Sequence, residues 1–162
     1  MVRSVVAGAA GTAAMTLAYE VERRVRHRTT SLDYDDSDVP GVIVANILDL
    51  HGLTTAEDLE LGELLRWGYG SAFGVWHGIL RQVMPEPYAA VAFGTTLLGA
   101  TFTAFPLLGR TPPPWRWPPD VLATAVGTHV VYTATAALVD DALAPTGRRS
   151  RRAARRTPAL GA

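Results

Sequence analysis

The chain contains no cysteine and no lysine among its 162 residues. The absence of cysteine excludes disulfide bonds, thiolate metal sites and thiol catalysis. Because lysine is missing, all 15 basic residues are arginines, and they offset 15 acidic residues to a net charge of zero. Charge is also nearly missing from several long stretches of the chain, and this absence is the most informative about its architecture.

Apolar residues make up 48% of the chain, and they gather in four segments with charged residues at or beyond the segment ends. A helix needs about 20 predominantly apolar residues to cross a bilayer. We therefore expect membrane spans at about 4–20, 64–84, 88–108 and 121–139. The predicted fold is all-α, an integral membrane four-helix bundle formed by a membrane domain of residues 1–143.

The first segment has two interpretations, a retained membrane anchor or a cleaved secretory signal peptide. Gly8 and Gly11 interrupt its apolar run, which is weak for a signal peptide. Glu20 and Arg24 then form an i,i+4 pair in the favourable order, and a second such pair follows. These pairs favour a retained helix that continues past the membrane to about His27.

Residues 29–60 form the longest predicted loop. Within it, about 40–51 has the pattern of a short helix that would reach only about 18 Å, too short for a hydrocarbon core of about 30 Å. We expect this helix to lie at the membrane interface. Four aspartates at 33–38 lack the spacing of an EF-hand calcium loop, so no metal site is predicted. A capping box at 54–57 opens the next helix.

Small residues recur four positions apart in the second and third spans. Helices in lipid associate through close backbone approach, which small residues at this spacing allow. The second span carries the clearest row, for which we predict a helix-packing role: Gly70, Gly74 and Gly78. The third span carries a comparable row: Ala92, Thr96, Ala100 and Ala104.

Two histidines, His77 and His129, lie within predicted spans. Ionisable groups at membrane depth are costly and often serve proton or ion paths, so both are candidates for such a path. The alternative is that each neutral imidazole only forms a hydrogen bond with a neighbouring helix. Arg66 and Arg81 lie near the two ends of the second span, and we expect them to extend to the membrane surfaces.

Residues 144–162 form a basic tail without periodicity, for which we predict disorder. Its basic residues can attract anionic lipid or determine topology. The tail has no aromatic residues between its arginines and no predicted folded element to present them, so we do not expect nucleic-acid binding. The residues concerned are Arg148, Arg149, Arg151, Arg152, Arg155 and Arg156.

The stretch 105–113, Phe-Pro-Leu-Leu-Gly-Arg-Thr-Pro-Pro, resembles the YagU-type family of bacterial inner-membrane proteins. The similarity extends over about 68–143, including the Gly127-Thr128-His129 motif in the last span, whereas the loop 29–60 departs from the longer insert of that family. The family has no characterised activity. The resemblance implies a multi-pass protein of the bacterial inner (plasma) membrane with both termini in the cytoplasm.

Arginine counts do not determine the orientation independently. With both termini inside, eight arginines lie inside and seven outside, a difference too small for the positive-inside rule.

The sequence therefore favours a small multi-pass membrane protein without enzymatic activity, a structural or partner subunit that needs no cofactor. Its predicted partners are the lipid bilayer and either a second copy of itself or another membrane protein. A small transporter or proton-linked channel that uses His77 and His129 is the alternative. The two interpretations differ in whether these histidines share a water-filled interior.

Overall fold

The computed structural model describes residues 1–26, 43, 55–108 and 111–145, and the regular structure of these residues is helical. The all-α class expected from the sequence is therefore confirmed for this part of the chain. Its elements are α1 (Val2–Arg26), α3 (Thr55–Val83), α4 (Tyr88–Leu108), the short 3-10 helix η1 (Pro114–Arg116) and α5 (Pro119–Ala142).

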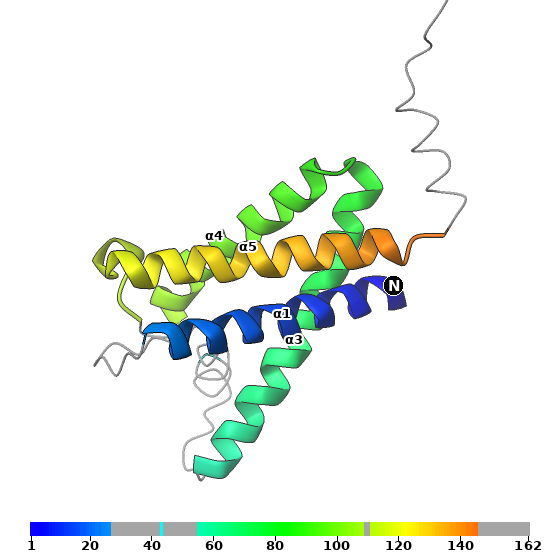
Figure 1. Cartoon of the computed structure of the whole chain (residues 1–162). Helices are drawn as coiled ribbons and strands as arrows, with labels where there is room; N and C mark the ends of the chain where they lie inside the picture. The colour runs from blue at the N-terminus through cyan, green and yellow to red at the C-terminus, as the bar shows by residue number, and fades with distance from the viewer. Residues whose placement is uncertain (27–42, 44–54, 109–110, 146–162) are drawn as a thin grey trace, which may run out of the picture.

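The helices α1 and α5 lie side by side and run in opposite directions (Figure 1). The N-terminus of the chain therefore lies beside the C-terminal end of α5. The helix α3 crosses α1 obliquely, and its N-terminal part extends away from the other helices (Figure 1). A tight turn joins α3 to α4, which packs against α5. Because α3 crosses its neighbours, the arrangement is less regular than a bundle of four aligned helices.

Two of the described helices, α4 and α5, are long and apolar enough to cross a membrane. The helix α4 coincides with the expected span 88–108, and α5 extends the expected span 121–139 at both ends. The helices α1 and α3 are long enough but do not reach the same apolarity. The predicted interfacial helix at about 40–51, apart from Ile43, and the basic tail from residue 146 onward lie outside the described residues.

The helices α1 and α3 approach each other closely where they cross. A Cβ atom added at Gly74 would lie 2.7 Å from both the Cα and the N of Gly8. Real Cβ atoms do not approach backbone atoms this closely, so the observed crossing requires glycine at this position. The glycine row of α3 therefore faces α1.

The other two glycines of this row contact the same helix. A Cβ at Gly70 would collide with the side chain of Thr12, and one at Gly78 would collide with Ser4. Ser4, Gly8 and Thr12 are themselves four residues apart, so α1 carries a matching row of small residues. The two rows interlock along the crossing.

The small-residue row expected on α4 lies at the edge of the face that this helix buries, since Ala92, Ala100 and Ala104 are half-buried. Thr96 is exposed, and the buried row is shifted by one residue toward the C-terminus. Large side chains fill the space between α4 and its neighbours, so close backbone approach is not needed there. The buried residues of α4 are Ala89, Phe93, Leu97 and Thr101.

The interior contains polar groups as well as an apolar core. Among the residues that the structure describes, the three largest side chains that are fully buried are Phe93, His77 and Asp140, and two of these are ionisable. Many large apolar side chains point outward instead, among them Leu17, Val21, Trp76, Ile79, Val91, Val130 and Leu138.

Candidate functional site

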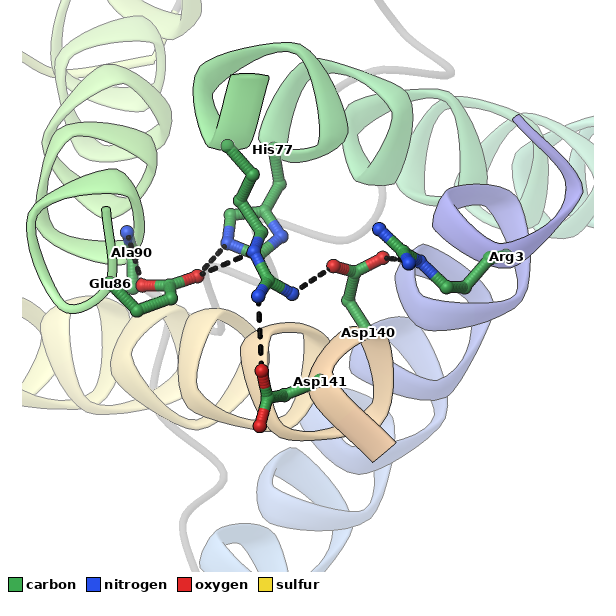
Figure 2. Close-up of polar contacts among 7 residues, drawn as sticks. Arg3, His77, Glu86, Ala90, Asp140 and Asp141 are labelled. Atoms are coloured by element: carbon green, nitrogen blue, oxygen red, sulfur yellow. Dashed lines mark hydrogen bonds and ion pairs between the residues drawn. The ribbon is translucent and has the colours of Figure 1, made fainter. Parts of the chain in front are cut away.

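Charged side chains from three helices and one turn meet at the end of the molecule where α1 begins and α5 ends (Figure 2). We call this group the charge cluster. Arg3 comes from α1, where it is the second residue of the helix, and the α3–α4 turn and α5 supply the acidic groups. The cluster comprises Arg3, His77, Arg81, Glu86, Asp140 and Asp141.

Asp140 is the centre of the cluster and is completely buried. One of its carboxylate oxygens accepts a hydrogen bond from Nε of Arg3 at 2.7 Å, and the other accepts one from Arg81. Arg81 also donates to Asp141 through Nη2 at 3.0 Å. The last turn of α5 is therefore tied to both α1 and α3.

Glu86, in the turn between α3 and α4, extends the cluster to α4. Its Oε1 atom accepts a hydrogen bond from Nε2 of His77 at 2.9 Å and lies 3.5 Å from Nε of Arg81. Its Oε2 atom accepts the backbone N–H of Ala90 at 3.1 Å. The first N–H groups of a helix have no partner within the helix, so this contact stabilises the start of α4.

The environment of Arg81 corrects one expectation from the sequence. We expect Arg81 from the sequence to extend to the membrane surface, but its side chain is only 8% exposed and donates hydrogen bonds to Asp140 and Asp141. Asp140 and Glu86 explain the difference, because buried carboxylates give the guanidinium ionic partners that lipid headgroups or water would otherwise supply.

His77 is buried among charged and aromatic groups. The carboxylate of Glu86 can only accept, so Nε2 of His77 carries a proton. The ring packs against Phe93 with 5.1 Å between centroids. The other ring nitrogen, Nδ1, is buried and has no hydrogen-bond partner among the described residues.

His129 has a different environment. Its Nδ1 donates to the backbone carbonyl of Ala125 at 2.8 Å, and its Nε2 lies 3.0 Å from the hydroxyl of Thr101. Because a carbonyl only accepts, the neutral ring carries its proton on Nδ1, and Nε2 accepts from Thr101. Both nitrogens of the neutral imidazole are therefore satisfied.

The two histidines are not hydrogen-bonded to each other in the described part of the chain. The ring of Phe93, which packs against His77, also packs against Tyr132, with 5.8 Å between centroids. His77 thus belongs to the charge cluster, whereas His129 lines a cavity.

This cavity has a volume of about 280 Å³ and lies between α1, α3, α4 and α5. Its wall is mainly aromatic and aliphatic, and Tyr132 closes part of it by donating a hydrogen bond to the carbonyl oxygen of Gly70 at 2.5 Å. The volume is just below the range of about 300–1,000 Å³ that is typical of small-molecule pockets.

The contact between His129 and Thr101 is directly testable. The Thr101→Val substitution should lower the free energy of unfolding by about 1–3 kcal/mol, because it leaves a buried acceptor on His129 unsatisfied. Thr103→Val is the matched control, since Thr103 is exposed and bonds only within its own helix. Equal losses in a detergent unfolding assay would show that the contact with His129 contributes nothing.

His77 is the only member of the charge cluster that the sequence indicates as a candidate functional residue, and Arg81 is expected only to extend to the membrane surface. Asp140 and Asp141 follow directly after the last predicted span, at 121–139, where a charge is expected in any case. The sequence contains one signal for this cluster, because four predicted spans of alternating direction would place Arg3, Arg81 and Asp140 at the same end of the bundle. Opposite charges at one side of a bundle favour ion pairing.

No group of three or more His, Asp or Glu residues suited to a metal ion occurs among the residues that the structure describes. The tail arginines, proposed to contact lipid, lie outside these residues. Comparisons with protein-family models, with curated proteins and with solved structures find no match for this chain.

Proposed function

We propose that the chain is a small multi-pass membrane protein that crosses the bilayer four times and acts as a structural or partner subunit without catalytic activity. The observation that carries this proposal is which side chains are buried and which are exposed. His77 and Asp140 are fully buried, while large apolar residues such as Leu138 are exposed. Such a surface suits lipid, and polar groups in membrane proteins usually face the interior.

The weak apolarity of α1 and α3 is compatible with this proposal. Both helices direct small residues toward each other, and small residues add little to apolarity. The charges at the N-terminal end of α1 and the C-terminal end of α3 have partners in the charge cluster, since Arg3 and Arg81 both bind Asp140. Paired charges at helix ends are compatible with a membrane span.

The charge cluster also supports a topology with both termini on one side of the membrane. Arg3 lies near the start of α1 and Asp140 near the end of α5, and the two form an ion pair. We place this side in the cytoplasm of a bacterium, as the YagU-type resemblance implies. There the arginine-rich tail would face anionic lipid.

Single cysteines test this topology, because the chain has none of its own. Ser37→Cys lies in the predicted first loop and Ser150→Cys in the tail. In intact cells, an impermeant thiol reagent should label the Ser37→Cys variant and leave the Ser150→Cys variant unlabelled. The protein should also sediment with the membrane fraction.

Permeabilised cells provide the control, since both variants should then be labelled. Equal labelling of the two variants in intact cells would contradict a membrane between the two positions. Recovery of the protein in the soluble fraction would contradict the membrane proposal as a whole.

The structural role is favoured over a transport path through both histidines. Such a path needs groups that can pass a proton between His77 and His129. The ring of Phe93, which packs on His77, has no such group, and both nitrogens of His129 are already satisfied within the protein.

A further inference from the structure

We propose that the cavity between α1, α3, α4 and α5 binds one hydrocarbon chain of a membrane phospholipid, from the leaflet opposite the charge cluster. The inference rests on the proposed membrane location and goes beyond it, because it assigns a ligand to a defined site inside the protein. Three observations carry it: the size of the cavity, the chemistry of its wall and its depth along α4.

The cavity is larger than an ordinary packing gap. Its volume is about 280 Å³, whereas protein interiors contain few voids larger than a water molecule. A cavity of about 150 Å³ with an apolar lining stays dry and binds benzene. Side chains around an empty cavity lose contacts, which is destabilising. A space of this size and lining therefore favours an apolar occupant larger than benzene.

The wall is mainly apolar, and several of its polar side chains already have partners within the protein. Thr12 and Thr16 donate to carbonyl oxygens one turn earlier in α1, at 3.1 and 2.9 Å. Tyr132 donates to a backbone carbonyl, and Thr101 donates to His129. A ligand therefore needs no hydrogen-bonding group of its own, and burying such a group there without a partner would be costly.

The remaining polar residues of the described wall give the same result. The hydroxyl groups of Tyr19 and Thr128 are hydrogen-bonded at 3.2 Å. Tyr69 and Arg66 also interact within the protein, so neither requires a polar ligand. Arg66 is the wall residue closest to the N-terminus of α3, whereas Arg81 of the charge cluster lies near the other end of this helix. The charged group of the described wall thus lies at the end of the cavity away from the cluster, where a lipid headgroup would lie.

The depth of the cavity matches one leaflet of a bilayer. Along α4 its wall extends from Leu97 to Phe105, a separation of eight residues that spans about 12 Å at a rise of about 1.5 Å per residue. A hydrocarbon core of about 30 Å gives each leaflet about 15 Å. Leu97 lies near the middle of α4, so the cavity runs from about the middle of the membrane toward one surface. On α5 it is lined by His129 and Tyr132 while the charge cluster begins at Asp140, so this surface is the one opposite the cluster.

Lipid can reach the cavity from the side of α4. Ala100 and Ala104 line the cavity and are half-buried, whereas Leu97 is buried. The segment 88–108 contains no charged residue, so hydrocarbon is the medium beside α4 in the proposed topology. These two alanines belong to the small-residue row that was expected to pack against another helix. Their small side chains leave space for a chain that enters directly from the bilayer.

A phospholipid that carries a photoreactive diazirine at the end of one acyl chain tests the proposal. The full-length protein is reconstituted in phosphatidylcholine vesicles that contain this lipid and is irradiated, and mass spectrometry then locates the modified residues. Adducts are expected at Leu97 and Tyr132, which are buried, so that lipid outside the cavity cannot reach them. Leu17 and Val130 report on the bilayer itself, because they are exposed and neighbour the lining residues in α1 and α5.

The two pairs of positions separate this inference from the membrane location on which it rests. Adducts at both pairs support both. Adducts confined to Leu17 and Val130 would overturn the cavity as a lipid site and leave the membrane location intact. Absence of adducts at all four positions would contradict the membrane location and the lipid ligand together.

Filling the cavity provides the variant test. Ala100→Phe places a ring in the cavity and should abolish the adducts at the two buried positions, while those at the two exposed positions remain. Ala104→Leu adds a smaller side chain to the same wall and should reduce the buried adducts. Ala72→Phe is the matched control, because Ala72 is exposed and does not line the cavity. Buried adducts that are as strong in Ala100→Phe as in Ala72→Phe would overturn the proposal.

Discussion

Replacing Gly74 with alanine should lower the free energy of unfolding by about 1–3 kcal/mol, the usual penalty for overpacking. The added methyl group would lie 2.7 Å from backbone atoms of Gly8, and a backbone cannot rotate out of the way as a side chain can. The helices α1 and α3 must therefore separate, which loosens the whole row of small residues. Thermal or denaturant unfolding in detergent measures the loss.

Gly99→Ala is the matched control, because a Cβ atom at Gly99 meets nothing within 4 Å. Both glycines lie inside helices, where alanine is favoured over glycine by up to about 1 kcal/mol. The two substitutions should therefore change stability in opposite directions. If Gly74→Ala is neutral or stabilising, the helices do not cross as closely as described.

Asp140→Asn should be the most damaging substitution in the charge cluster and lower the free energy of unfolding by about 3–5 kcal/mol. Its carboxylate is completely buried between two guanidinium groups, those of Arg3 and Arg81. An amide of the same size keeps the shape but leaves these cations without their shared counter-charge. Unfolding in detergent is again the measurement.

The neighbouring residue supplies the control for this experiment. Asp141→Asn removes the same charge from a side chain that is 45% exposed, and exposed ion pairs contribute only about 0–1 kcal/mol. A large difference between the two variants is expected. Similar losses would mean that the burial of Asp140 does not determine its importance.

The positions of the helices could be predicted from the sequence because charge and proline delimit them. The span predicted at 88–108 coincides with α4, since Glu86 and Pro87 precede it and Gly109 follows. The start of α3 was indicated by a capping box, and the helix begins at Thr55. These signals are local, so a single sequence contains them.

The contacts between helices could not be predicted in the same way. Gly8 and Gly11 were interpreted only as interruptions of an apolar run, but a Cβ at Gly8 would meet α3 and one at Gly11 would meet Tyr132. A small residue has the same appearance in a sequence whether or not a partner helix lies against it. Its role depends on which helix packs against it, and that helix is formed by residues far away in the sequence.

The charge cluster illustrates the same limit for the candidate site. The sequence identified His77 as an ionisable residue within a span, but its first partner, Glu86, is nine positions away, beyond the end of the helix. Arg81 and Asp140 are 59 positions apart. Only the folded arrangement of α3 and α5 brings them together. The periodicity of a single helix therefore cannot predict this pair.

The pairing of Arg3 with Asp140 has a consequence for the order in which the protein can be completed. The two residues are 137 positions apart, so the partner of one of the first residues emerges from the ribosome only after nearly all of the described chain. The helices α1 and α3 can meet earlier, but the arginines at that end then lack Asp140. A nascent or truncated chain without α5 therefore lacks the carboxylate that neutralises these two arginines.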